Sequence, residues 1–311
     1  GVAILRTGLS AKHARVVETA ARIVRDVDPA LRGSFEDDLL GALDLWLDDE
    51  RRRDPGCLAK TALVVALVAR ERERRGGVTP GLLRQRLRDA ARHVAWENVY
   101  GGRVDVAGDL RIAAAAGLIT VADPHALPVI ADHLDYPLLP VRRAAARNLQ
   151  AHGGPGAALL LRLRARIGDV EPNGLGEVLR ALLAVDEDAF EVAADWLDVP
   201  AGDDAEAVFA EAALALGEAG GDAAGELLRR AWDVHLDEER RRVLVAALAQ
   251  VRSEASLAFL VDVVRDAVPT LAGDAAALLG ACLGEGALRD ALHQAIEERG
   301  ERAVREAAGL D

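Results

Sequence analysis

Residues 135–149 read Asp-Tyr-Pro-Leu-Leu-Pro-Val-Arg-Arg-Ala-Ala-Ala-Arg-Asn-Leu. The first half contains two prolines, and proline cannot continue a helix from its interior but is tolerated in the first helical turn. The second half is rich in Ala, Arg and Leu, which are strong helix formers. The stretch therefore predicts a turn followed by a helix that extends to Leu149.

Similar Ala- and Leu-rich segments recur along the chain, and each ends in a leucine. The closing leucines are Leu118, Leu149, Leu183, Leu216, Leu248 and Leu279. They are separated by 31, 34, 33, 32 and 31 residues. Second apolar segments lie between them, at 126–134, 157–167, 189–197, 223–234 and 256–267. A period of about 32 residues accommodates two helices and two turns, so the sequence predicts an all-α solenoid of antiparallel helix pairs in a single superhelical array.

The 135–149 stretch resembles a HEAT repeat, in which an Asp in the turn precedes Val-Arg and an Ala-rich second helix. The resemblance implies that Asp135 and Arg142 support the turn and stack between repeats. It extends over about residues 105–298. The separate stretch Asp54-Pro-Gly-Cys-Leu-Ala-Lys-Thr-Ala62 is similar to bacterial HEAT-repeat proteins of unassigned role. The resemblance implies an architecture but no particular activity.

The regularity of the repeats divides the chain into three parts. Residues 1–104 are predicted to be helical but irregular, residues 105–298 to form the regular repeats, and residues 299–311 to form a C-terminal tail. In the first part, Ser10 and Ser34 are expected to cap helices, because a serine hydroxyl accepts hydrogen bonds from free backbone amides.

Charge is distributed unevenly along the chain. The net charge is −13, yet residues 51–103 contain 13 basic and 5 acidic residues. Within this stretch Arg84, Arg88 and Arg92 recur at four-residue spacing and form a stripe on a predicted helix. Arginine binds phosphate in bidentate geometry, so the stripe is a candidate nucleic-acid site, as in DNA-repair glycosylases built from HEAT-like repeats. The acidic remainder would repel a polyanion, so we keep this function as the alternative.

The stretch from Trp96 to Arg111 interrupts the repeat pattern. It reads Trp-Glu-Asn-Val-Tyr-Gly-Gly-Arg-Val-Asp-Val-Ala-Gly-Asp-Leu-Arg. Aromatic and arginine side chains are enriched at binding hot spots, so the stretch is either a loop that contacts a partner or a loop that fills a gap between irregular repeats. The candidate contact residues in it are Trp96, Glu97, Tyr100, Arg103, Asp105 and Arg111.

Polar residues on the second helix of each pair are further candidates, because these helices are expected to line the concave surface of such a solenoid. They are Arg143, Arg147, Glu177, Arg180, Glu211, Glu218, Arg242 and Asp274. The acidic excess favours a partner with basic patches. The sequence therefore favours a non-catalytic scaffold or adaptor that binds a protein partner on its concave face, and it leaves the oligomeric state open.

Motifs for catalysis or cofactor binding are absent from the sequence. Cys57 and Cys282 lie 225 positions apart and are expected to be buried small hydrophobic residues. His125 and His133 are about two helical turns apart, too far to share one metal ion. The longest apolar run, 62–69, is too short to span a bilayer. We therefore expect no cofactor, no metal, no membrane association and a cytoplasmic location, and the Gly at position 1 suggests a trimmed chain.

Overall fold

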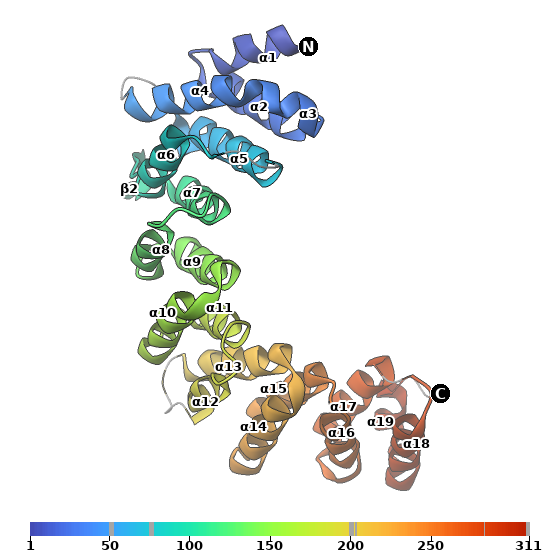
Figure 1. Cartoon of the computed structure of the whole chain (residues 1–311). Helices are drawn as coiled ribbons and strands as arrows, with labels where there is room; N and C mark the ends of the chain where they lie inside the picture. Colours follow the sequence, from blue (N-terminus) through green and yellow to red (C-terminus); the bar gives the residue numbers. More distant parts are fainter. Residues whose placement is uncertain (50–52, 75–77, 199–201, 203, 283, 309–311) are drawn as a thin grey trace. The chain divides into compact units, whose positions relative to one another are not determined.

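The computed structural model describes residues 1–49, 53–74, 78–198, 202, 204–282 and 284–308. Arg51, Arg52 and Arg75, which belong to the predicted basic stretch, lie outside these ranges. Within the described ranges the chain is helical except for one short hairpin and the connecting turns (Figure 1). The predicted all-α class, a repeat of helix pairs, is confirmed.

The chain divides into two compact units, Gly1–His152 and Gly153–Asp311. The first unit contains α1 (Val2–Leu9), α2 (Ala14–Asp26), α3 (Pro29–Arg32), η1 (Gly33–Phe35), α4 (Glu36–Asp48), η2 (Pro55–Cys57), α5 (Leu58–Arg72), α6 (Gly81–Ala91), β1 (Trp96–Val99), β2 (Gly102–Asp105), α7 (Gly108–Thr120), α8 (Ala126–Leu134) and α9 (Leu139–His152). The second unit contains α10 (Gly154–Ile167), α11 (Pro172–Leu183), α12 (Phe190–Ala194), η3 (Asp195–Asp198), α13 (Ala205–Ala219), α14 (Gly221–Val234), α15 (Glu238–Val251), α16 (Glu254–Asp266), α17 (Pro269–Cys282), α18 (Ala287–Arg299) and α19 (Arg302–Ala307).

The helices of each unit alternate between two layers. In the first unit α2, α5, α7 and α9 pack successively on one another, and α4, α6 and α8 cover α5, α7 and α9. In the second unit α11, α13, α15, α17 and α19 form the successive layer, and α10, α12, α14 and α16 cover its first four helices. Each repeat is therefore a helix pair that buries its apolar faces against its neighbours.

The closing leucines lie in the core of their units. All six are at most 8% exposed, and each lies on a helix of the successive layer. The intervening apolar segments coincide with α8, α10, α12 with η3, α14 and α16. The leucine spacing in the sequence therefore identified the layer to which each helix belongs.

The predicted caps at Ser10 and Ser34 are wrong. Ser10 follows the short helix α1, and its hydroxyl donates to the Arg6 carbonyl at 3.1 Å. Ser34 lies within η1, and its hydroxyl donates to the Leu31 carbonyl at 2.7 Å. Both hydroxyls satisfy carbonyl groups of a preceding helical turn, because a short helix precedes each serine.

The two cysteines lie in different environments. Cys57 is buried, as predicted, whereas Cys282 is exposed at the end of α17, contrary to the prediction. The last turn of a helix contacts fewer neighbours than its middle, so an apolar sequence there does not ensure burial. Among the described residues, no helix combines the length and the apolar character needed to cross a bilayer.

Candidate interaction site

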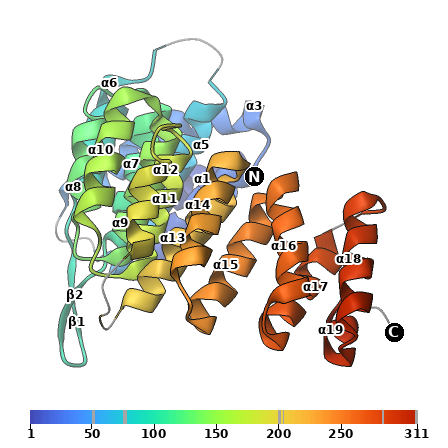
Figure 2. The ribbon, with the colours of Figure 1, turned by 90° about the horizontal axis from the view of Figure 1, so that it is seen from below.

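A β-hairpin is inserted between the two helices of one repeat. Residues 92–107 separate α6 from α7, whereas only residues 135–138 separate α8 from α9. The hairpin occupies most of the longer connection, and it projects past the helix ends of its own unit (Figure 2). The stretch that the sequence analysis interpreted as a loop is therefore an ordered hairpin followed by the first turn of α7. Insertions of this kind in repeat proteins often carry binding function.

The tip of the hairpin is a two-residue turn, Tyr100-Gly101, between paired Val99 and Gly102. Gly101 has a φ of +93°, which suits a turn that requires a left-handed residue at its second position. A side chain at this position would be strained, so the glycine allows the tight reversal. The reversal leaves the Tyr100 side chain fully exposed at the tip.

Apolar side chains on the hairpin are exposed to solvent. Trp96 is 56% exposed, and Val99 and Val104 are also more than one-third exposed. The Arg103 guanidinium lies 5.7 Å from the centre of the Trp96 ring, at a distance that permits a cation–π contact. One face of the hairpin therefore presents Trp96 and Arg103, the opposite face presents Val99 and Val104, and Tyr100 lies at the tip.

The base of the hairpin is held by the buried carboxylate of Asp105. Its Oδ2 accepts hydrogen bonds from Arg111 Nη2 at 2.5 Å and from the Tyr136 hydroxyl at 2.7 Å. Its Oδ1 accepts the backbone amides of Ala95 and Ala107, each at 3.1 Å. One carboxylate therefore ties both ends of the hairpin to α7 and to the turn that precedes α9.

The electrostatics of this cluster favour one protonation state. Burial alone would raise the pKa of Asp105, but the hydrogen bonds from Arg111, Tyr136 and the two amides bring that pKa below its ordinary value. Burial and the hydrogen bond to Asp105 raise the pKa of Tyr136. The carboxylate is therefore ionised and the phenol protonated at neutral pH, which is the combination that the hydrogen bond requires.

Arg111 connects the same cluster to the helix layer. Its Nη1 donates to the His93 carbonyl at 2.5 Å, and its guanidinium lies 4.2 Å from the centre of the Tyr136 ring. The arginine is only 1% exposed, and the Asp105 side chain is 6% exposed. The structure thus places these two predicted contact residues in the interior, where they support the hairpin rather than reach its surface.

A second attachment uses the turn before α5. Glu97 Oε1 accepts the Gly56 amide at 2.6 Å. Asp54 in turn accepts the amides of Ala59 and Lys60, at 2.9 and 3.1 Å, and so caps the start of α5. The segment 54–60 therefore positions the face of the hairpin that carries Glu97.

The Cys57 thiol in this turn is buried beside the hairpin attachment. Burial raises its pKa to about 11. A thiol with so high a pKa is almost fully protonated at neutral pH and is a poor nucleophile. Cys57 therefore packs in this turn as a small, buried and protonated side chain.

Arg111 belongs to a recurring set of turn arginines, of which the sequence analysis expected only Arg142 to support its turn. Arg111, Arg142 and Arg241 are each the fourth residue of their helix, α7, α9 and α15. Arg142 donates to the Tyr136 carbonyl at 2.9 Å, and Arg241 donates to the His235 carbonyl at 2.8 Å. Their spacing of 31 and 99 residues, about one and three repeats, was the signal that could have identified them.

The predicted arginine stripe is partly neutralised within the chain. Arg84 and Arg88 each lie 3.9 Å from the buried carboxylate of Asp123, and Arg88 Nη1 lies 3.1 Å from His125 Nδ1. Arg92 follows the last residue of α6 and is exposed. The structure therefore brings two members of the stripe to one acidic residue and leaves the third at the helix end.

Neighbouring arginines of the basic stretch are paired with acidic residues of α4. Arg86 contacts Asp44 and Asp48 through bonds of 2.6 to 3.0 Å, and Arg70 lies 3.3 Å from Glu36. Among the described residues, part of the basic excess counted along the sequence is thus paired in space with acidic residues that precede it. This pairing weakens the case for a phosphate-binding surface.

Most of the charged candidates on the second helices join adjacent helices. Arg180 on α11 lies 2.8 Å from Glu211 and 2.9 Å from Glu218, both on α13. Arg242 on α15 lies 3.0 Å from Asp274 on α17. Arg143, Arg147 and Glu177 also interact within the chain, and Arg147 is exposed. These charges therefore tie successive repeats together as well as facing solvent.

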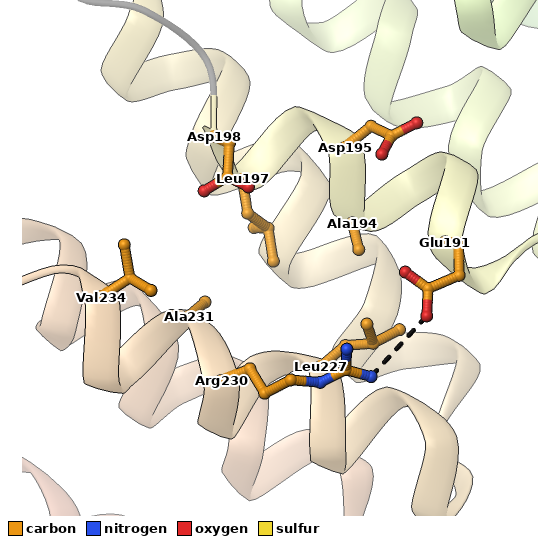
Figure 3. A pocket seen from close by; sticks show the side chains of 9 residues that line it. All are labelled: Glu191, Ala194, Asp195, Leu197, Asp198, Leu227, Arg230, Ala231 and Val234. Carbon is orange, nitrogen blue, oxygen red and sulfur yellow. Dashed lines mark ion pairs between the residues drawn. The ribbon is translucent and has the colours of Figure 1, made fainter.

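The second unit contains a cleft between α12 with η3 and α14 (Figure 3). Its volume is about 190 Å³, and its lining combines apolar side chains with three carboxylates and one arginine. Arg230 lies 3.7 Å from Glu191, and Asp195 lies 3.3 Å from Arg166. Because these charges already face partners within the chain, we assign no ligand to the cleft.

Comparisons with known proteins add little beyond the fold. No protein-family model and no curated protein sequence matches the chain. An engineered protein of known structure is similar over 98% of this chain and 86% of its own, with 15% identity and a TM-score of 0.39. Human deoxyhypusine hydroxylase, in a complex with glycerol, is similar over 90% of this chain and 96% of its own, with 19% identity and a TM-score of 0.34. Similarity at this level does not indicate a function.

Proposed function

We propose that this chain is a non-catalytic HEAT-type scaffold that binds a protein partner through the hairpin of residues 96–105. The observation that carries the proposal is an anchored hairpin with exposed apolar side chains. Trp96 and Tyr100 are exposed, while Asp105 beneath them accepts four hydrogen bonds. A helical-repeat protein has no need of such an insertion for its own core, since each repeat buries its apolar face against its neighbours.

Because the hairpin is already anchored, little conformational freedom has to be lost when a partner binds it. Binding immobilises side chains and loops, and that loss of freedom opposes association. The hairpin is already bonded to the turn before α5, to α7 and to the turn before α9. Its backbone therefore loses less freedom on binding than the backbone of an unanchored loop would. Tryptophan, tyrosine and arginine are also the residue types most enriched at binding hot spots, and Trp96, Tyr100 and Arg103 supply one of each.

Charge supports a partner with basic patches. The first unit contains 23 basic and 20 acidic residues, for a net charge of +3. The second contains 15 basic and 31 acidic residues, for a net charge of −16. A unit with this charge attracts a basic partner at long range and raises its association rate. The charged residues of the second helices, such as Arg147 and Glu218, would then guide orientation, and the cytoplasm is the expected setting.

The experiment is affinity capture from native lysate with three forms of the full chain. The wild type is compared with Trp96→Ala/Tyr100→Ala and with the control Leu159→Ala/Leu163→Ala, which removes two exposed leucines of α10. We expect a stoichiometric protein with the wild type and the control, and at least about tenfold less with the hairpin variant. Equal recovery with all three forms would show that the partner binds elsewhere. Turnover of a small molecule by the purified chain would contradict a non-catalytic role.

A further inference from the structure

The hairpin has only two strands, so each strand has one edge without a neighbour. The Val106 amide donates to the Ala95 carbonyl at 2.8 Å, which identifies these residues as a hydrogen-bonded pair. Bonded and non-bonded pairs alternate along antiparallel strands. The register therefore directs the main-chain N–H and C=O groups of four residues away from the hairpin: Trp96, Asn98, Arg103 and Asp105.

The two edges differ in accessibility. Both outward-facing residues of β1, Trp96 and Asn98, are exposed. On β2, Arg103 is exposed, but the Asp105 side chain is held in the interior by Arg111. No backbone hydrogen bond from another described residue reaches the outward groups of Trp96 and Asn98. The β1 edge is therefore the more open template for a further strand.

We propose that the β1 edge accepts an extended segment of the partner protein as a third strand. This inference rests on the proposed function and specifies how the partner binds. Unpaired N–H and C=O groups on one edge are complementary to an extended backbone, whereas a helix has already satisfied its own. A second copy of this chain could offer the same edge, and the test below separates that occupant from a partner segment.

The side chains along the β1 edge should favour particular residues in the added segment. Trp96 and Asn98 share one face of the hairpin with Arg103, while Glu97 on the opposite face is bonded to Gly56. Alternate side chains of an added strand lie on one face. The segment is therefore expected to place apolar residues at alternate positions, next to Trp96. Its backbone supplies affinity, and these side chains supply specificity.

The test uses 12-residue peptides selected by phage display on the immobilised full chain. Their affinities are measured by fluorescence anisotropy for the wild type, for the hairpin variant Trp96→Ala/Tyr100→Ala and for four variants of the hairpin edges. Asn98→Pro removes an outward N–H on β1 and adds a ring at that edge, while the bonds within the hairpin remain. Asn98→Ala removes only the side chain. Arg103→Pro makes the same change on the β2 edge, and Arg103→Ala accounts separately for the loss of the Arg103 side chain, which the proposed function places at the binding surface.

We expect Asn98→Pro to weaken peptide binding at least about tenfold relative to Asn98→Ala, and Arg103→Pro to bind within about threefold of Arg103→Ala. Hydrogen exchange on the wild type gives a readout that needs no substitution. Bound peptide should slow exchange at the amides of Trp96 and Asn98, and loss of protection at Val106 in a variant would reveal an unfolded hairpin.

Each of the other possible results of this test would contradict a different part of the proposal. In one outcome, peptide binding is lost in Trp96→Ala/Tyr100→Ala but retained in Asn98→Pro, and the peptide does not slow exchange at the amides of Trp96 and Asn98. This result would be consistent with the proposed function but would contradict the added strand. Loss of binding in Arg103→Pro, with binding retained in Arg103→Ala and Asn98→Pro, would show that the added strand pairs with β2 instead of β1. Concentration-dependent protection without peptide would identify a second copy as the occupant. If no selected peptide depends on the hairpin, both the inference and the proposed site fail.

Discussion

At the scale of single residues, Asp105 holds the candidate site together. It accepts two side-chain and two backbone hydrogen bonds: Oδ2 accepts from Arg111 and Tyr136, and Oδ1 accepts the amides of Ala95 and Ala107. A buried ion pair stabilises a fold only while both partners are present, because a lone buried charge is costly. The position of the exposed aromatic residues of the hairpin therefore depends on Asp105 and Arg111, which lie in the interior.

Replacing Arg111 with methionine should destabilise the first unit. The substitution leaves the Asp105 carboxylate buried without its cation, and breaking such a pair costs roughly 3–5 kcal/mol of unfolding free energy. Denaturant unfolding of the full chain, followed by circular dichroism, measures the change. Arg103→Met on the exposed face is the control and should change the unfolding free energy by less than about 0.5 kcal/mol. Equal effects of the two substitutions would contradict the structural role of Arg111.

Acid should weaken the same cluster. The pKa of Asp105 is lower in the folded chain than the ordinary value of about 3.9. Its ionised form therefore stabilises the fold above about pH 4, and this contribution is lost as the pH falls through the lowered folded pKa. The difference in unfolding free energy between the wild type and Asp105→Asn should thus be largest near pH 7 and shrink below about pH 4. A difference that stays constant from pH 7 to pH 3 would argue against an ionised Asp105.

At the scale of elements, the sequence predicted what repeats and missed what interrupts the repeat. The leucine spacing placed the second helices correctly, because each closing leucine must reach the core. The hairpin was read as a loop, because Trp96–Val99 and Gly102–Asp105 are too short to show an alternating pattern. The sequence also did not reveal that Arg84 and Arg88 share an acidic neighbour, since Asp123 lies more than 30 positions later.

Replacing glycine with alanine should have opposite effects on stability at a close helix contact and at an open helix position. A Cβ atom on Gly217 in α13 would lie 2.6 Å from the Ala247 carbonyl oxygen in α15, and backbone atoms cannot give way easily. Gly217→Ala should therefore lower the unfolding free energy by about 1–3 kcal/mol. Gly41, within α4, has open space at the same position, so Gly41→Ala should raise it by about 0.5–1 kcal/mol. Thermal unfolding of both variants checks the signs, and a stabilised Gly217→Ala would refute the close contact.

At the scale of the whole molecule, the two units carry different charge. The first is nearly balanced, with a net charge of +3, and the second has a net charge of −16. Many basic residues of the first unit are already paired, as Arg86 is with Asp44 and Asp48. The charge distribution therefore favours a basic protein partner over a polyanion.

Nucleic acid should bind weakly, if at all. Titration with duplex DNA and single-stranded RNA at 50 and 200 mM salt measures this, because phosphate contacts weaken steeply with salt. We expect no saturable binding at either salt concentration. Saturable binding at 50 mM that disappears in Arg84→Ala/Arg88→Ala/Arg92→Ala would support the alternative function and count against the scaffold.

The most direct measurement is photo-cross-linking from the tip of the hairpin. Tyr100, which is fully exposed, is replaced by benzoylphenylalanine, and the full chain is irradiated in native lysate. The same replacement at Leu159, an exposed residue of α10, is the control. The account predicts one discrete protein adduct from position 100 and none of the same mass from position 159. The same adduct from position 159, together with no adduct from position 100, would contradict it.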